Sequence, residues 1–301
     1  MLGELLALRS CWPLAVVVAV VAVAAPSPAG ATQTDLPRDF ELSDVAWGGF
    51  GGGESRRECG ELKHHPIILV HGDRAGPEAW LVGDEDGVVG ALERAGFGPC
   101  EIWALRVGEA GKPLRSLEEL TDDVKVFIYA VLSYTGAPRV QMIGDGVGAV
   151  LIHASLTKYN LHNLVHAAVY LDAPFGGLAE CDDDRCFSGE VLCCALRRKS
   201  GFLDRTLLPL ETPHVLAAVP DEGPTGHLRY LAVGSSPPVP MASRTEHLGG
   251  WMLDGAWNLS FPELALGPPH HVPELWSVLV RALSDPASAC VLADDGDEDG
   301  Y

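Results

Sequence analysis

Basic residues are scarce in this sequence. Its 301 residues include 21 lysines and arginines against 41 aspartates and glutamates, which gives a formal net charge of −20 at pH 7. A surface this acidic repels the phosphates of nucleic acids and of anionic membranes. We therefore expect no nucleic acid among the partners of this protein.

Long apolar runs are missing everywhere except near the N-terminus. Residues 13–25 are apolar throughout, and the small residues Ala29, Gly30 and Ala31 follow shortly afterwards. A membrane-spanning helix needs about 20 apolar residues, whereas a shorter run before small residues is typical of a secretory signal peptide. We predict a cleaved signal over residues 1–31, a secreted location, extracellular or periplasmic, and no integral membrane span; an uncleaved anchor is the alternative.

The cysteines lack the paired C-x2-C spacing of a structural zinc site, so we expect no metal and no cofactor. One of the eight, Cys11, falls in the predicted signal. Export favours disulfides, and the odd number that remains leaves at least one thiol free or bonded to another chain. A bridge between Cys59 and Cys100 is feasible if the strands that they precede are neighbours.

The stretch that organises the rest of the chain has glycine where a serine would be expected. Residues 140–148 read VQMIGDGVG, so a short strand ends in three alternate glycines and passes directly into an apolar helix. This is the pattern of a nucleophile elbow, G-x-S-x-G, whose central residue takes a positive φ between small neighbours. The central residue here is Gly146. The pattern therefore predicts an elbow without its nucleophile.

Three other interpretations of these glycines stay open. A phosphate-binding turn is one, because backbone N–H groups at a helix N-terminus attract anions. A dinucleotide-binding turn would need G-x-G-x-x-G, and the third glycine comes one residue too early for that pattern. The third interpretation makes Asp145 the nucleophile. This shifts the elbow pattern by one residue and puts Ile143 and Val147 where small residues are needed.

Strands and helices alternate before and after this stretch. Ser116 and Glu119 form a capping-box pattern that opens a helix, which Gly136 ends. Further strands are expected over Pro66–Val70, Cys100–Val107 and Val165–Leu171, and further helices over Val88–Ala95 and Glu274–Leu283. Such a series predicts an α/β protein with a doubly wound, mainly parallel sheet.

The turn after the first predicted strand reads His71-Gly72-Asp73. In hydrolases with an elbow, a backbone N–H at this turn and the N–H after the nucleophile together bind the oxyanion. Those residues are Asp73 and Val147 here. A plain strand-to-helix turn is the alternative for this pattern.

Three stretches together resemble the class 2 secreted lipases: Pro66–Gly72, residues 100–103 and Tyr134–Gly148. They are also similar to extracellular polyhydroxybutyrate depolymerases with a lipase-like scaffold. The resemblance implies an α/β-hydrolase fold over residues 32–289, with a small cap or lid insertion at about residues 179–214. The alternative for that insertion is a disulfide-tied surface loop.

The catalytic residues of this family are only partly matched. Its elbow reads GHSMG or AHSMG, so Asp145 replaces a histidine and Gly146 replaces the serine. The family acid follows a late strand, and the matching stretch around Ser236 contains no carboxylate; Glu246 and Asp254 are alternatives without supporting spacing.

The family histidine precedes the last helix, where this chain has His270 and His271. We favour His271 because an apolar residue follows it. A solvated loop feature is the alternative interpretation of this histidine pair.

Two motifs near the C-terminus are interpreted differently. Leu253–Asn258 is expected to be a loop, and Asn258-Leu259-Ser260 is a glycosylation sequon if the host glycosylates. Residues 290–301 begin a calcium-loop pattern but end before its bidentate acid, so we expect a disordered acidic tail.

The sequence therefore predicts a secreted, lipase-like protein that is catalytically inactive and binds a lipid, an ester or a partner protein. Loss of the nucleophile in a protease such as subtilisin lowers the rate by about six orders of magnitude. One alternative is an active carboxylic ester hydrolase, a lipase, esterase or polyester depolymerase, with an unusual catalytic set. Another is an interaction protein for which the fold is only a scaffold.

Overall fold

The computed structural model describes twelve parts of the chain. They are residues 61–72, 76–80, 87–107, 115–178, 181, 191–198, 200–207, 229–235, 250–251, 253, 256–261 and 272–284, with side chains at most of these positions. The chain divides into residues 1–30 and residues 31–301, and all described residues belong to the second unit. The predicted signal peptide and the predicted acidic tail therefore lie outside the described residues.

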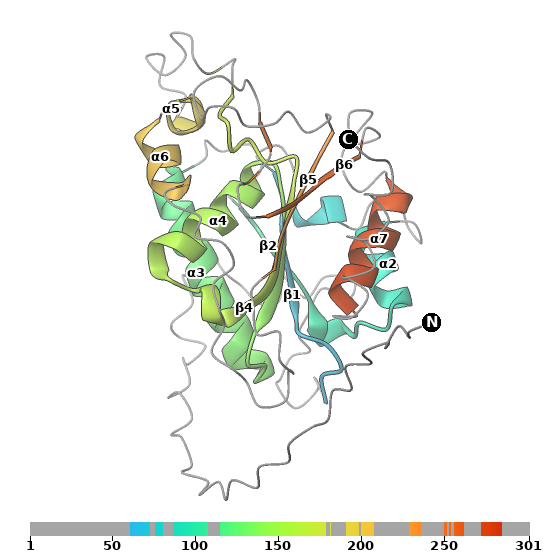
Figure 1. Cartoon of the computed structure of the whole chain (residues 1–301). Coiled ribbons are helices and arrows are strands. Elements are labelled where there is room, and N and C mark those ends of the chain that lie inside the picture. The colour runs from blue at the N-terminus through green and yellow to red at the C-terminus, as the bar shows by residue number, and fades with distance from the viewer. Residues whose placement is uncertain are drawn as a thin grey trace, which may run out of the picture. The chain divides into compact units, whose positions relative to one another are not determined.

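Six parallel strands form one sheet, as expected (Figure 1). Their order is β2-β1-β3-β4-β5-β6. The first strand, β1, is therefore second from one edge, with β2 on one side and β3 to β6 on the other. The strands are β1 (Ile67–Val70), β2 (Ile102–Leu105), β3 (Val140–Asp145), β4 (Val165–Leu171), β5 (Arg229–Gly234) and β6 (Trp257–Ser260). Because all five pairings are parallel, the carboxyl ends of the strands share one edge of the sheet.

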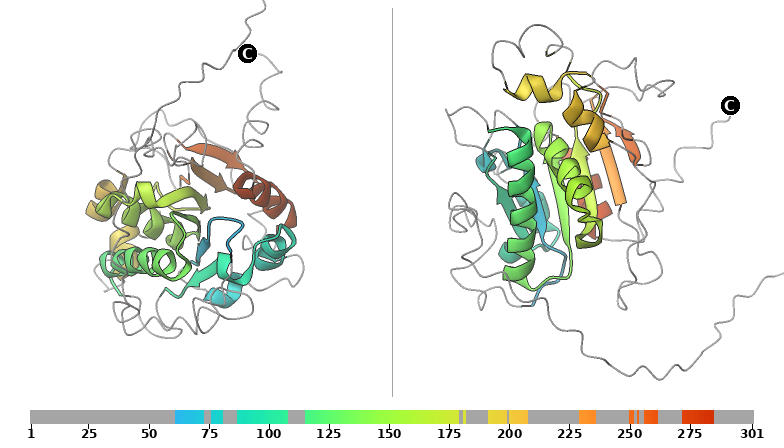
Figure 2. Two further views of the ribbon diagram at one scale, coloured as in Figure 1. Left: turned by 90° about the horizontal axis from the view of Figure 1, so that it is seen from below. Right: turned by 90° about the vertical axis from the view of Figure 1, so that its left-hand side faces the viewer.

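Helices cover both faces of this sheet (Figure 2). One face carries α3 (Leu117–Thr135) and α4 (Val147–Tyr159), and the other carries α2 (Val88–Arg94) and α7 (Pro273–Ser284). Alternate residues of β1 serve the two sides: Val70 packs into the core beneath α3 and α4, and Leu69 into the core beneath α2 and α7. A strand buried on both faces must be apolar throughout, which explains the continuous run in β1.

The remaining elements are short. They are η4 (Pro77–Trp80), η6 (Pro99–Glu101), η7 (His162–Leu164), α5 (Val191–Leu196) and α6 (Gly201–Leu207). Within the described parts of the chain, no helix is both long enough and apolar enough to cross a bilayer.

Helix α3 begins and ends where the sequence predicts. The Ser116 hydroxyl accepts a hydrogen bond from the Glu119 N–H at 3.3 Å, and the Glu119 carboxylate accepts one from the Ser116 N–H at 3.1 Å. Gly136 ends the helix with a φ of 73°, a conformation that favours glycine. Both ends depend on local chemistry, which is why the sequence alone locates them.

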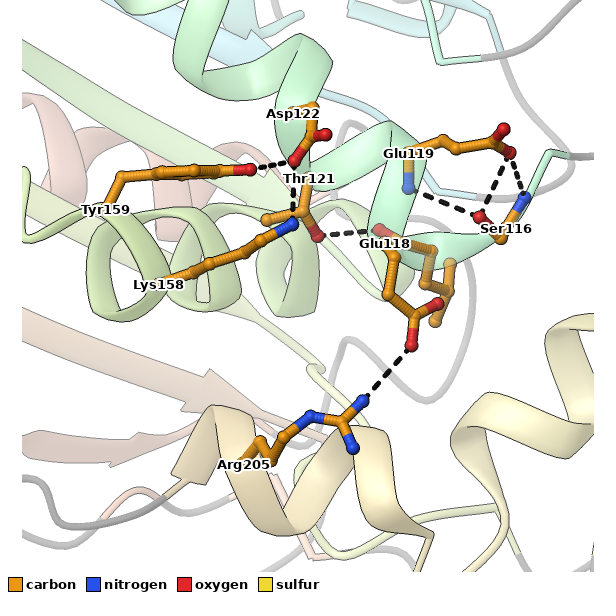
Figure 3. A network of polar contacts seen from close by, with 9 residues as sticks. Ser116, Glu118, Glu119, Thr121, Asp122, Lys158, Tyr159 and Arg205 are labelled. Atoms are coloured by element: carbon orange, nitrogen blue, oxygen red, sulfur yellow. Dashed lines mark hydrogen bonds and ion pairs between the residues drawn. The ribbon is translucent and has the colours of Figure 1, made fainter.

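Polar contacts join the outer surfaces of α3, α4 and α6 (Figure 3). The Asp122 carboxylate of α3 contacts the Lys158 ammonium of α4 at 2.7 Å and also accepts a hydrogen bond from the Tyr159 hydroxyl. The Arg205 guanidinium of α6 contacts the Glu118 carboxylate of α3 at 3.2 Å. These exposed ion pairs contribute little stability individually.

The segment predicted as a cap holds α5 and α6 in its described part. A disulfide joins Cys181 to Cys193, and Cys194 is also disulfide-bonded, as is Cys100. The Leu178 N–H donates a hydrogen bond to the Leu196 carbonyl, so this segment is fixed to the loop after β4. Helix α6 packs against α4.

The strand predicted over Cys100–Val107 is shorter than expected. Cys100 and Glu101 form the 3-10 turn η6 instead, because the buried Glu101 carboxylate accepts hydrogen bonds from backbone N–H groups around it. The donors are the N–H groups of Gly98 and His64, both at 2.8 Å, and that of Lys63. The His64 ring also lies 3.1 Å from this carboxylate.

Burial by itself raises the pKa of the Glu101 carboxyl. The hydrogen bonds from the backbone and from the His64 ring outweigh burial, so the net effect lowers its pKa. Glu101 therefore stays ionised and links the segment before β1 to the beginning of β2.

The expectation of a loop over Leu253–Asn258 is wrong at its end. Trp257 and Asn258 belong to β6, which pairs with β5 at the edge of the sheet. The Asn258 amide nitrogen donates hydrogen bonds to the carbonyls of Leu253 at 3.1 Å and Ala256 at 2.9 Å. Because this nitrogen is the atom that glycosylation would modify, the geometry argues against use of the sequon.

Candidate active site

The predicted elbow joins the end of β3 to the beginning of α4. Gly146 has φ 52° and ψ −115°, which gives the central residue the expected positive φ. Its N–H donates a hydrogen bond to the Leu171 carbonyl at the end of β4, at 2.8 Å. The neighbouring strand therefore holds the turn directly.

The two outer glycines are required by close backbone contacts. A Cβ on Gly144 would lie 2.5 Å from the Ala149 Cα, and a Cβ on Gly148 would lie 2.2 Å from the Val70 carbonyl oxygen. Real Cβ atoms do not approach backbone so closely, so neither position accepts a side chain without displacement of the sheet or helix. Strand, turn and helix are packed as tightly here as an elbow demands.

The central glycine differs from the outer two. A Cβ on Gly146 would have no described atom within 4 Å. Its positive φ still strains any L-residue, but space does not exclude one. Within the described part of the chain, nothing obstructs a side chain at position 146, as is expected for the position of a nucleophile.

His71 fixes the turn after β1. The Val107 N–H donates a hydrogen bond to its Nε2 atom at 2.9 Å, so Nε2 carries no hydrogen. Nδ1 therefore carries the hydrogen and donates it to the Gly72 carbonyl at 2.7 Å. This buried ring joins the ends of β1 and β2 and holds the backbone that leads to Asp73, which lies outside the described residues.

Asp145 places its carboxylate beside the same turn. Its Oδ2 atom is 3.3 Å from where a Cβ on Gly72 would lie. The residue is half-buried at the last position of β3. The Asp145 side chain thus lies beside Gly72, the residue before the predicted oxyanion donor Asp73.

The predicted site residues are only partly described. Gly146 and Val147 lie together at the elbow, and the Val147 N–H begins α4. Asp73, Ser236 and His271 lie outside the described residues, so their proposed roles stay predictions. Their sequence neighbours Gly72, Ser235 and Val272 are described, at the ends of β1 and β5 and before α7.

Sequence reasoning missed one polar residue at this edge of the sheet. Asp172 follows β4 with a φ of 44°, which is uncommon for a residue other than glycine. Its carboxylate contacts Ser235 after β5. The only sequence signal is its place directly after a buried strand.

A neutral histidine of the elbow helix α4 is fully buried. His153 of α4 has no exposed surface, and its Nδ1 atom lies 3.1 Å from the Tyr170 hydroxyl. The rings of Phe175 and Tyr230 meet it nearly edge-on. Burial, and secondly the nearby His162, lower the pKa of His153 to about 3. Its Nε2 atom has no hydrogen-bond partner in the described part of the chain.

Metal ligation finds no support in the described residues. No group of three or more histidine, cysteine, aspartate or glutamate side chains there is arranged to hold an ion.

Comparison with known proteins gives one family match. Residues 64–203, slightly less than half of the chain, match the family described as Lipase (class 2). This segment includes β1 to β4 and the elbow. No curated protein shows significant sequence similarity to the chain.

Solved structures add similarity in fold. Aspergillus fumigatus lipase B is 15% identical with a TM-score of 0.50, over 83% of this chain and 55% of that one. Bacillus licheniformis lipase BlEst2 in mature form is 15% identical with a TM-score of 0.46, over 77% of this chain and 95% of that one. Its propeptide form is 16% identical with a TM-score of 0.41, and the chain spans 35% of its length.

The family match and the likeness to Aspergillus fumigatus lipase B, with the parallel six-stranded sheet and its flanking helices, confirm the expected α/β-hydrolase fold. At such low identity, likeness to the solved lipases concerns the fold alone. The elbow and its surroundings are therefore the features that bear on function.

Proposed function

We propose that this chain is a secreted, lipase-like α/β-hydrolase that has lost its catalytic activity and binds a lipid or ester ligand. The observation that carries the proposal is Gly146, a glycine with positive φ at the centre of an otherwise complete elbow. An ordinary strand-to-helix turn has no need for the close packing at Gly144 and Gly148. That packing is understandable if the chain descends from an enzyme that used position 146.

Loss of activity follows from the chemistry of acyl transfer. A serine hydrolase forms an ester between its nucleophile and the acyl group, and glycine has no atom that can form this bond. The binding site and oxyanion hole of such enzymes leave a residual acceleration of roughly 10³- to 10⁴-fold over water. We expect the parent chain to reach at most that level.

A retained oxyanion hole would still recognise a carbonyl group. We propose the N–H groups of Val147 and Asp73 as its donors, with His271 as the retained histidine and Ser236 as the position of the family acid. The hydrogen-bonded His71 supports this proposal, because it fixes the backbone between β1 and Asp73. The ligand class is then an ester or lipid with a carbonyl at the elbow.

The test is hydrolysis of short-chain and long-chain p-nitrophenyl esters by the purified chain. Gly146→Ser restores the nucleophile, and Gly146→Ala is the matched control with a side chain but no hydroxyl. We expect no turnover from the parent or the alanine variant, and turnover from the serine variant. A double variant, Gly146→Ser with Ser236→Asp, asks whether the family acid is needed as well.

Two results would count against the proposal. Ester hydrolysis by the parent that disappears in His271→Ala would show an active hydrolase with a different nucleophile. A serine variant that neither hydrolyses esters nor reacts with a fluorophosphonate would show that the site has not been retained. The fold would then be only a scaffold, as in the interaction-protein alternative.

A further inference from the structure

The loop after β4 connects the support of the elbow to the segment that holds α5 and α6. At the end of β4, the Leu171 carbonyl accepts the hydrogen bond from the Gly146 N–H. At the other end of the loop, the Leu178 N–H donates a hydrogen bond to the Leu196 carbonyl of α5 at 2.8 Å. The Phe175 side chain between them is buried. This packed loop therefore ties α5 to the strand that supports the elbow.

Two further contacts fix α5 to the same loop. A disulfide joins Cys181 to Cys193, and both residues are buried. Gly177 has a φ of 85°, and a Cβ there would lie 2.8 Å from the backbone nitrogen of Arg198 and 2.9 Å from its Cα atom. Real Cβ atoms do not approach backbone so closely, so the loop and the residue after α5 meet backbone to backbone. Close packing and a covalent bond thus hold the same helix.

Ser200 joins α5 to α6. Its hydroxyl donates a hydrogen bond to the Ala195 carbonyl of α5 and accepts one from the Leu203 N–H of α6 at 3.0 Å. Leu203 and Phe202 are buried in the core that also contains α3 and α4. Helix α6 lies beside α4 in both views (Figures 1 and 2). The core therefore holds α6 directly, whereas α5 depends on its contacts with the loop.

We propose that the Cys181–Cys193 disulfide is a lock that keeps α5 against the loop after β4. With the disulfide intact, α5 and α6 form a fixed part of the scaffold and not a lid that opens. Without it, α5 separates from the loop while α6 stays anchored in the core. Binding of the proposed lipid or ester at the elbow then needs no movement of α5, and this consequence rests on the proposed function.

The first test measures amide hydrogen exchange in the intact chain. The Leu178 N–H reports on the contact between the loop and α5. The Asp204 N–H, which donates a hydrogen bond to the Ser200 carbonyl at 3.0 Å, reports on α6. A locked α5 opens only together with α6, so we expect the protection factors of the two amides to agree within about tenfold. Lower protection of Leu178 than this would show that α5 opens with the disulfide intact, which overturns the proposal.

The second test removes the lock. The double variant Cys181→Ala with Cys193→Ala eliminates both sulfurs and keeps these buried positions apolar. The disulfide spans 12 residues and restricts the opened state of α5, so we expect exchange at Leu178 to become roughly 10- to 100-fold faster without it. Exchange at Asp204 and at Gly146 should stay near the parent rate, because α6 and the elbow keep their own contacts.

The matched control is Arg205→Gln, which removes an exposed contact between α6 and Glu118 of α3 (Figure 3) and should leave exchange at Leu178 unchanged. Unchanged exchange at Leu178 in the alanine pair would show that the hydrogen bond and the Gly177 contact hold α5 by themselves. Faster exchange at Gly146 as well would show that the disulfide supports the whole fold. Either result overturns the proposal, and neither involves ester hydrolysis, so this proposal and the proposed function can fail separately.

Discussion

A carboxylate at the amino edge of the sheet and a carboxylate at its carboxyl edge differ in burial and in hydrogen bonding. At the amino edge, the buried Glu101 carboxylate is surrounded by donors from Lys63, His64 and Gly98. At the carboxyl edge, the exposed Asp172 carboxylate has donors on one oxygen only among the described residues, and both donors belong to Ser235. A saturated buried charge serves the fold, whereas a partly bonded charge at the carboxyl edge is available to a ligand or to a catalytic group.

The first prediction concerns the amino edge. We expect Glu101→Ala to lower the free energy of unfolding by about 3 kcal/mol, because buried N–H groups lose a charged acceptor. Urea denaturation followed by circular dichroism would measure it. Glu119→Ala, which removes an exposed capping carboxylate of α3, is the matched comparison and should cost about 1 kcal/mol or less. Equal losses would mean that the Glu101 carboxylate contributes no more to the free energy of unfolding than an exposed capping carboxylate does.

The second prediction concerns His153, the buried histidine of α4. The folded-state pKa of His153 is about 3, below the usual value of 6.5, so below pH 6.5 the unfolded chain binds the proton more readily. Stability is therefore complete above pH 6.5 and falls as the pH drops toward 3. At pH 5 the loss is about 2 kcal/mol relative to pH 7.5.

His153→Phe should remove most of this difference, whatever its effect on stability at pH 7.5. Urea denaturation of both proteins at pH 5 and pH 7.5 would measure the change. Glu101 does not affect the comparison between pH 5 and pH 7.5. Its pKa is lowered below 4.5, so its contribution to the free energy of unfolding is lost only in more acidic solution. An unaltered pH dependence in the variant would show that His153 is protonated in the folded chain.

Much of the scaffold could be predicted from sequence because its signals are local. The elbow pattern identifies Gly146, since strand, turn and helix at this spacing leave room only for glycine at the outer positions. The capping box at Ser116 locates α3 for the same reason. The family match over residues 64–203 includes both features.

Other features depend on contacts between distant residues. The strand β6 was missed because it is four residues long and lies at the edge, where its pairing with β5 defines it. Asp172 was missed because its conformation depends on Val233 and Ser235, more than 60 positions along the chain. Glu101 was placed in a strand because its donors, such as His64, are close only in the folded chain.

The third prediction is the smallest and bears directly on the difference between the edges. We expect Asp172→Asn to change the free energy of unfolding by less than about 0.5 kcal/mol, because the side chain is exposed and asparagine can keep both the positive φ and the bond from Ser235. Urea denaturation beside Glu101→Ala gives the comparison. A loss as large as that of Glu101→Ala would mean that the Asp172 charge supports the fold. A small loss would mean that the Asp172 charge contributes little to stability, unlike the Glu101 charge at the amino edge.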